Sequence, residues 1–167
     1  MKRIRVKFRT MARTVDFHEL KKSLPTLGKV RIVLTGGCFD ILHIGHIRFL
    51  SEAKRMGDYL VVLLESDQKV KDLKGKNRPV FTQEERAEML SALGSVDLVV
   101  LLPTMGNESD YLDLAMEINP DVIAVTENDP RIEEKKRQAG KIGGELKIIP
   151  LTKRFSTSKL AKILIVE

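Results

Sequence analysis

The sequence has few of the features that mark a secreted or membrane protein. It contains one cysteine, Cys38, among 167 residues, which excludes an internal disulfide and argues against a zinc site built from cysteines. Its longest apolar runs, over residues 60–64 and 98–102, are far shorter than the roughly 20 residues that cross a bilayer. No apolar stretch follows the N-terminal charges, so no secretory signal is expected. We therefore expect a cytoplasmic protein that does not enter a membrane.

Aromatic residues are also scarce, at 5% of the chain with no tryptophan, whereas basic residues are concentrated at one end. Residues 1–31 hold ten Lys and Arg and two acids, a net charge of +8, and the remainder holds 19 basic and 21 acidic residues, a net charge of −2. A basic arm over residues 1–28 suits nucleic acid, but it lacks aromatic side chains on which bases stack. We expect a solvated arm and no nucleic-acid partner, with Met11 as an alternative start of the chain.

The remaining sequence alternates between two kinds of segment. Its hydrophobic content of 43% and charged content of 31% are those of a soluble globular domain, and its length fits one domain, over residues 29–167, after the arm. Short apolar runs predict five strands, over residues 31–35, 58–65, 96–102, 122–126 and 146–149. Helices are predicted over residues 14–24, 44–56, 83–93, 109–118, 130–141 and 156–164. Residues 66–76 are predicted to be a polar connection.

Strands that alternate with helices at this spacing predict an α/β fold with a five-stranded parallel sheet between layers of helices. Thr82 and Glu85 have the spacing of a capping box, which supports the helix that follows them. In such sheets ligands bind beyond the carboxyl ends of the strands, where the strand order reverses. This rule directs attention to residues 36–46, which follow the first predicted apolar strand.

These residues combine two glycines with two histidines. Gly36 and Gly37 follow the strand, and Gly45 lies between His43 and His46 at the expected start of a helix. A helix N-terminus attracts phosphate through its free N–H groups and its dipole, and Gly45 lets a phosphate approach the backbone. Histidines three residues apart lie on one side of a helical turn, so both can donate to one polyphosphate.

Other phosphate-binding motifs are missing from the chain. It has neither the Gly-x4-Gly-Lys-Ser/Thr pattern nor Gly-x-Gly-x-x-Gly, so P-loop and dinucleotide-binding sites are disfavoured. Two of the three histidines bracket a glycine at the expected ligand-binding edge. That placement favours a polyphosphate site over two ordinary surface histidines and a turn.

The segment Gly37-Cys38-Phe39-Asp40-Ile41-Leu42-His43-Ile44-Gly45-His46 resembles the Gly-x-Phe-Asp-x-x-His-x-Gly-His signature of the cytidylyltransferase-like nucleotidyltransferases. Leu73-Lys74-Gly75, Arg78-Pro79-Val80 and Glu85-Arg86 also resemble family segments, and Phe155-Ser156-Thr157-Ser158 resembles the Ile-Ser-Thr-Thr signature. The resemblance covers residues 29–164 and implies a Rossmann-like nucleotidyltransferase fold. It also implies a transferase that commonly forms homodimers.

Within the family, the chain looks most like the adenylyltransferase domain of bifunctional ADP-heptose synthases. Archaeal FAD synthases and glycerol-3-phosphate cytidylyltransferases are near relatives. The sequence departs from the cytidylyltransferases at Leu151, where they have arginine, and over residues 126–129, where a glycine- and aspartate-containing segment is usual. We therefore favour transfer of AMP from ATP to a phosphorylated small molecule such as a sugar phosphate, and transfer of CMP stays open. FMN or glycerol 3-phosphate are alternative acceptors, and a non-catalytic nucleotide-binding regulator is an alternative of another class.

The transfer needs alignment and charge neutralisation more than a strong base, because the acceptor phosphate is already anionic. Mg²⁺ is the expected cofactor, held mainly by the triphosphate rather than by protein side chains. Cys38 has no base spaced to activate it and is not expected to be a nucleophile. Catalytic roles are expected for His43, His46, Lys74, Ser156 and Thr157. Nucleotide contacts are expected from Gly36, Gly37, Cys38, Phe39, Asp40, Gly45, Lys76, Arg78, Arg86, Glu127, Asp129 and Ser158.

Overall fold

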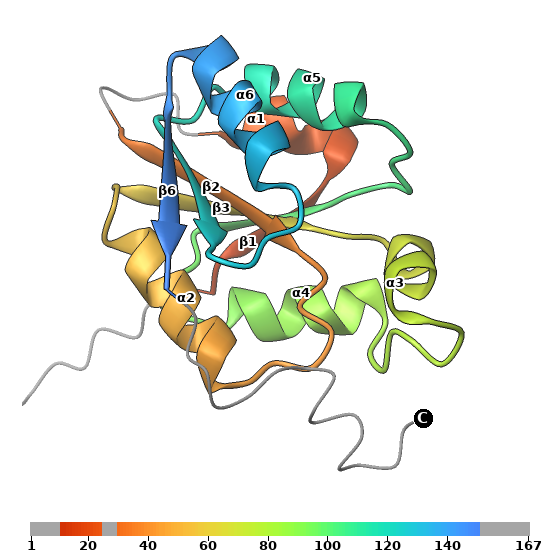
Figure 1. The fold of residues 1–167 in the computed structure, drawn as a ribbon. Helices are drawn as coiled ribbons and strands as arrows, with labels where there is room; N and C mark the ends of the chain where they lie inside the picture. The colour runs from red at the N-terminus through yellow and green to blue at the C-terminus, as the bar shows by residue number, and fades with distance from the viewer. Residues whose placement is uncertain (1–10, 25–29, 151–167) are drawn as a thin grey trace, which may run out of the picture.

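The computed structural model describes residues 11–24 and 30–150, and it has the predicted α/β architecture (Figure 1). All of the strands pair in parallel in one six-stranded sheet with the order β1-β4-β3-β2-β5-β6. The strands are β1 (Arg13–Asp16), β2 (Ile32–Gly37), β3 (Tyr59–Leu64), β4 (Leu98–Leu101), β5 (Val122–Thr126) and β6 (Glu145–Ile149). The prediction of five strands was one short, because it missed β1.

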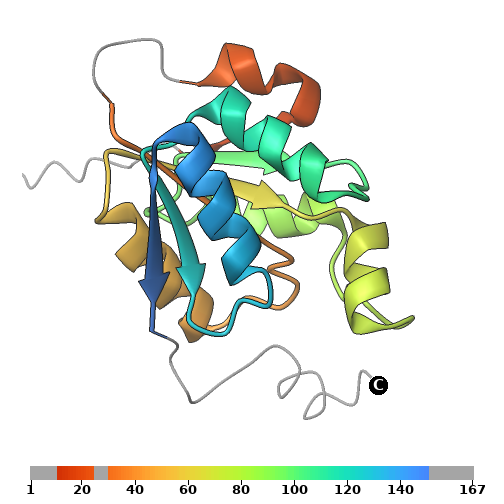
Figure 2. The same cartoon turned by 45° about the horizontal axis from the view of Figure 1, so that its top comes forward.

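Helices cover both faces of the sheet. They are α1 (Leu20–Ser23), α2 (Ile44–Lys54), α3 (Asp67–Lys74), α4 (Gln83–Ser91), α5 (Glu108–Ile118) and α6 (Ile132–Ile142), and a 3-10 turn, η1 (Phe17–Glu19), precedes α1. Helices α2 and α4 lie on one face, and α1, α5 and α6 lie side by side on the other (Figures 1 and 2). No helix in the described part of the chain is long and apolar enough to span a bilayer.

The central strands are buried on both faces, which explains why their sequences read as continuous apolar runs. In β3, Leu60, Val62 and Leu64 belong to the core under α2 and α4, whereas Val61 and Leu63 belong to the core under α5. All five side chains are buried. The alternation of side chains along a strand therefore gives each face of the sheet its own apolar core.

Two segments differ from their predictions. Residues 13–16, predicted as part of a helix over 14–24, form the edge strand β1, which pairs with β4 and buries only Val15. Residues 67–74, predicted as part of a polar connection, form α3, whose only buried residue is Val70. Each segment buries a single apolar side chain, so the period of its hydrophobic residues gave no signal. The predicted capping box is confirmed, because Thr82 and Glu85 bond reciprocally at the start of α4.

The strand order reverses between β2 and β5. The chain adds β3 and β4 on one side of β2, and then crosses to place β5 and β6 on the other side. Val33 and Leu34 of β2 pair with Val122 and Ile123 of β5 at this switch point. The carboxyl end of β2 is therefore the position where a parallel sheet opens a crevice for a ligand.

Candidate active site

The two glycines at the carboxyl end of β2 belong to the strand and not to the loop that was predicted. Gly36 pairs with Leu63 and Gly37 with Leu64, and the Gly37 carbonyl accepts a bond of 3.1 Å from the Glu65 amide. A side chain on Gly37 would start 3.1 Å from the ring of Phe39. Phe39 itself has a φ of +43°, a conformation that a bulky residue adopts only when its surroundings hold it there. Gly37 provides the space into which that ring packs.

Phe39, His46 and His43 form a stack of rings at the start of α2. The ring of Phe39 meets the imidazole of His46 edge-on, with centroids 5.3 Å apart, and the His43 and His46 rings are stacked at 3.9 Å. Phe39 is buried in the core beneath α2. The core therefore fixes the orientation of both histidines through Phe39. The two rings lie together at the start of α2, as their spacing in the sequence predicted.

His43 caps helix α2 through its side chain. Its Nδ1 accepts a bond of 3.1 Å from the backbone N–H of Gly45. An imidazole nitrogen that accepts a bond carries no proton, so the neutral ring holds its proton on Nε2. Gly45 thus orients His43, and the Nε2–H of His43 remains a donor.

Both histidines are disposed to be neutral. Burial lowers the pKa of His43, and the nearby charge of Lys74 lowers it further. Burial also lowers the pKa of His46 to about 3, with contributions from His43 and Lys74, and the backbone of Ile41 acts in the opposite direction. Neutral imidazoles donate N–H groups to phosphate oxygens without being charged beforehand. An arriving polyphosphate favours their protonation, because an opposite charge raises a histidine pKa.

Asp40 and Arg78 form a buried ion pair beside this loop. Asp40 is fully buried, and its carboxylate contacts the guanidinium of Arg78. The same carboxylate accepts a bond of 2.7 Å from the backbone N–H of Val80. Both charges are thus committed to each other, and the pair ties the histidine loop to the chain before α4. Both side chains were predicted to contact the nucleotide, and the structure shows them buried and paired with each other.

Arg86 connects several of the loops that surround the site. Its side chain is wholly buried and donates to the carbonyls of Phe81, Cys38 and Glu65 and to the carboxylate of Asp67. It thereby connects the carboxyl ends of β2 and β3 to the starts of α3 and α4. A nucleotide contact was predicted for Arg86, but four of its five N–H groups donate to these protein groups and hold the loops in position.

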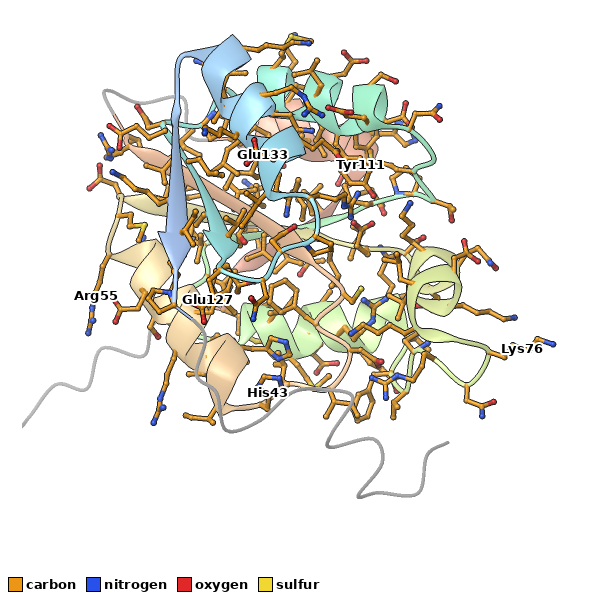
Figure 3. The ribbon with its side chains drawn as sticks, in the orientation of Figure 1. His43, Arg55, Lys76, Tyr111, Glu127 and Glu133 are labelled. Carbon is orange, nitrogen blue, oxygen red and sulfur yellow. The ribbon has the colours of Figure 1, made fainter. Side chains whose placement is uncertain are left out.

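Of the two lysines predicted to bind phosphate, Lys74 lies near the histidines and Lys76 does not. Lys74 is the last residue of α3, and it is close enough to His43 and His46 for its charge to lower the pKa of both rings. Gly75 follows with a φ of +106° and turns the chain. Lys76 then points away from the body of the molecule, far from His43 (Figure 3). The structure therefore brings Lys74 into the site and leaves Lys76 outside it.

A cavity of about 370 Å³ opens on the face of β2 opposite to α2. It is lined by Gly36, Gly37 and Cys38 at the end of β2, by Lys74 of α3 and by residues of α5 and α6. Burial raises the pKa of the Cys38 thiol, which agrees with its prediction as a non-nucleophile. The carboxyl end of β2 therefore separates two compartments, with the histidines on one face and the cavity on the other.

Two acidic residues of the loop after β5, Glu127 and Asp129, were predicted to contact the nucleotide, and only Asp129 lines the cavity. Asp129 lines the cavity, where its carboxylate accepts bonds from the Arg131 backbone at 2.8 Å and from Lys135 Nζ at 2.6 Å. Glu127 (labelled in Figure 3) is exposed, its amide donates to the carbonyl of Ile149 at the end of β6, and it lies outside the lining of the cavity. Ser156, Thr157 and Ser158, together with the family departure at Leu151, lie outside the described residues.

The sequence analysis missed several polar residues of the cavity, among them Glu65, Tyr111 and Arg131. These three come from the end of β3, from α5 and from the start of α6, and no local pattern connects residues so far apart. Within residues 11–24 and 30–150, no three His, Cys, Asp or Glu side chains gather closely enough to hold a metal ion.

Comparisons with known proteins agree with this geometry. Residues 34–162 match the family model described as cytidylyltransferase-like. The bifunctional protein HldE of Koribacter versatilis is 42% identical over 132 residues, which are 78% of this chain and 26% of that protein. HldE of Campylobacter jejuni subsp. doylei is 41% identical over 152 residues, 87% of this chain and 32% of that protein. The chain thus spans about a quarter to a third of the length of these relatives.

A solved structure from Thermoplasma volcanium GSS1, described as a lipopolysaccharide core biosynthesis protein, is also similar. It is 32% identical to this chain, with a TM-score of 0.61. The match covers 75% of this chain and 99% of that one. A separate protein of nearly the same extent as the matched region therefore has this fold.

Proposed function

The chain belongs to the cytidylyltransferase-like family, and from this membership and the site geometry we propose that it transfers AMP from ATP to a sugar phosphate, releasing pyrophosphate. One observation carries the proposal. Lys74 acts electrostatically on the histidine pair on one face of β2 and also lines the cavity on the other face. Two anionic reactants can therefore meet at the end of β2, beside a positive charge.

The reaction joins an oxygen of the acceptor phosphate to the α-phosphorus of ATP and breaks the bond from that phosphorus to the oxygen bridging to the β-phosphate. Pyrophosphate leaves with that oxygen, so the number of P–O bonds is unchanged. The attacking oxygen is already anionic, and no protein base is required. The protein contributes alignment and neutralisation of the charge that develops on the phosphates.

His43 and His46 suit the triphosphate side of this reaction. Their rings are stacked at the N-terminus of α2, where the helix dipole favours a negative charge. In the neutral state each ring has one N–H group to donate. We assign the two histidines to the α- and β-phosphates of ATP. We assign Lys74 to the place where the α-phosphate of ATP meets the acceptor phosphate.

Mg²⁺ is the cofactor that fits this arrangement. The carboxylate nearest the histidine loop, Asp40, is buried and bound to Arg78 and the Val80 amide, so it is not free to hold a metal. The triphosphate, rather than protein side chains, would hold the ion, since Mg²⁺ usually retains several waters and is bound through substrate phosphates. Its contribution is to neutralise phosphate charge. A cytoplasmic location belongs to the same proposal.

The similarity to the bifunctional HldE proteins and the Gly-Cys-Phe-Asp segment support ATP and a heptose 1-phosphate as the first pair of reactants to test. In ADP-heptose the AMP unit is joined through a second phosphate to the sugar, so the matching acceptor is the sugar phosphate. FMN with ATP, and glycerol 3-phosphate with CTP, are the alternative pairs.

The test is pyrophosphate release by the full chain with Mg²⁺, crossing ATP and CTP with heptose 1-phosphate, mannose 1-phosphate, glycerol 3-phosphate and FMN. We expect turnover with ATP and a sugar phosphate and a loss of roughly 10²-fold or more in kcat for His46→Ala. His18→Ala is the matched control, because His18 lies on η1, outside the site, and should retain full activity. ATP binding without turnover on any acceptor would favour the regulator over the enzyme.

A further inference from the structure

The cavity on the α5 and α6 face contains a polar cluster for which the phosphate-transfer chemistry gives no reason. Glu65, directly after β3, is almost completely buried. Its two carboxylate oxygens each lie 3.0 Å from the hydroxyl of Tyr111 on α5. The guanidinium of Arg131, at the start of α6, lies 3.6 Å from the same carboxylate and 5.0 Å from the centre of the Tyr111 ring.

The three side chains come from three different elements and meet in the cavity that begins at Gly36 and Gly37 (Figure 3 labels Tyr111). Burial and the charge of Glu65 raise the pKa of Tyr111 to about 12, so its hydroxyl keeps its proton and donates to the carboxylate. Glu65 has two oxygens with further acceptor capacity, and Arg131 has more N–H donors than Glu65 can use. The cluster therefore retains donors and acceptors for a guest molecule.

The charge of the lining indicates what kind of guest fits. The cavity is lined by three acidic and three basic side chains, namely Glu65, Asp129, Glu134, Lys74, Arg131 and Lys135. Lys74 acts on the histidines, and the other five charged side chains have no excess of positive charge that would attract a second phosphate. Aliphatic side chains of β2, β3 and β5 form the remaining wall. Alternating donors and acceptors beside an apolar wall suit a neutral polyhydroxyl group.

We propose that Glu65, Tyr111 and Arg131 are specificity-determining residues that hydrogen-bond the hydroxyl groups of the acceptor sugar while its phosphate lies at Lys74. This inference rests on the proposed function. A site built to hydrogen-bond a hydroxyl rejects an analogue without it, because buried polar groups are then left unpaired. The cluster thus selects an acceptor with several hydroxyls over a small alcohol phosphate.

Tyr111→Phe is the sharpest variant, because it removes the hydroxyl and keeps the ring beneath Arg131. With heptose 1-phosphate we expect kcat/KM to fall about tenfold, through a higher KM for the acceptor and an unchanged KM for ATP. With glycerol 3-phosphate, which has too few hydroxyls to reach the cluster, the loss should be clearly smaller. Tyr59→Phe is the matched control, since Tyr59 is the other tyrosine of the chain, begins β3 at its amino end and does not line the cavity.

A purely structural cluster would give a different pattern. If the three residues only fasten α5 and α6 to β3, Tyr111→Phe will lower kcat/KM equally for all acceptors, or will raise the KM of ATP by the same factor. Either result overturns the inference. Glu65→Gln, which keeps the side-chain volume, provides a second measurement and should also weaken discrimination among sugar phosphates.

Calorimetric binding of heptose 1-phosphate to the full chain separates this inference from the proposed function. If no acceptor turns over, yet the wild type binds the sugar phosphate more tightly than Tyr111→Phe does, recognition stands and the transfer reaction falls. If the wild type turns over and Tyr111→Phe retains its acceptor selectivity, the inference falls alone. Absence of both binding and turnover overturns both.

Discussion

His46 is held neutral in the folded protein but takes up a proton readily in the unfolded one. The free energy of unfolding should therefore fall as the pH falls. Its pKa is about 3 in the folded chain and about 6.5 in an unfolded one. Between these values the unfolded state binds a proton that the folded state does not, so the free energy of unfolding falls with falling pH. The two pKa values give a loss of about 2 kcal/mol between pH 7 and pH 5.

The assay is urea unfolding of the wild type and of His46→Gln at several pH values from 7 to 5. Carboxylates and other groups titrate in both proteins, so the difference between the two curves isolates His46. We expect His46→Gln to lose about 2 kcal/mol less than the wild type over this interval. His18→Gln controls for the loss of an exposed imidazole and should follow the wild type. Parallel curves for the wild type and His46→Gln would refute the buried, neutral state of this ring.

Five further substitutions test other parts of the scaffold and of the site. Arg86→Lys should lower the free energy of unfolding by about 3 kcal/mol, measured in urea, because an ammonium cannot serve the four groups bound by the guanidinium. Gly57→Ala should destabilise by about 1–3 kcal/mol, since its Cβ would lie 2.6 Å from a carbonyl oxygen. Gly140→Ala, in open space on α6, should stabilise by about 0.5–1 kcal/mol, and equal effects for the two glycines would contradict this reasoning. Lys74→Ala should lower kcat roughly 10²-fold and Lys76→Ala should not, so similar pyrophosphate-release rates would remove Lys74 from the site.

The strongly periodic and apolar parts of the fold could be predicted from the sequence. The buried strands β2, β3 and β5 and the capped helix α4 lie close to their predicted ranges. The edge strand β1 could not be recognised, since three of its four residues are exposed. Helix α3 had a usable signal, because Ser66 caps it by accepting a bond from the amide of Lys69. That signal was weaker than the polar composition that suggested a connection.

The histidine loop was predictable because the residues that form it are adjacent in the sequence. The stacked pair His43 and His46 follows from their spacing on one turn of a helix. The partners of the nearby charges were not predictable, since Asp40 and Arg78 are separated by 37 intervening residues and Arg86 reaches back to Cys38. Long-range pairing decides whether a cation near a phosphate site is free to bind a ligand. The sequence pattern shows the cation but not its partner.

The position of the two compartments on opposite faces of β2 has a consequence for the order of events. On the proposed assignment, the nucleotide binds at the histidines on one face of β2 and the sugar beside Tyr111 on the other, so neither reactant should block the site of the other. Either reactant can then bind first, and both must be present before transfer. No nucleophile need carry the AMP, since the Cys38 thiol has a raised pKa. Initial-rate plots should therefore intersect, as for a random sequential mechanism, and exchange of label between pyrophosphate and ATP should require the acceptor.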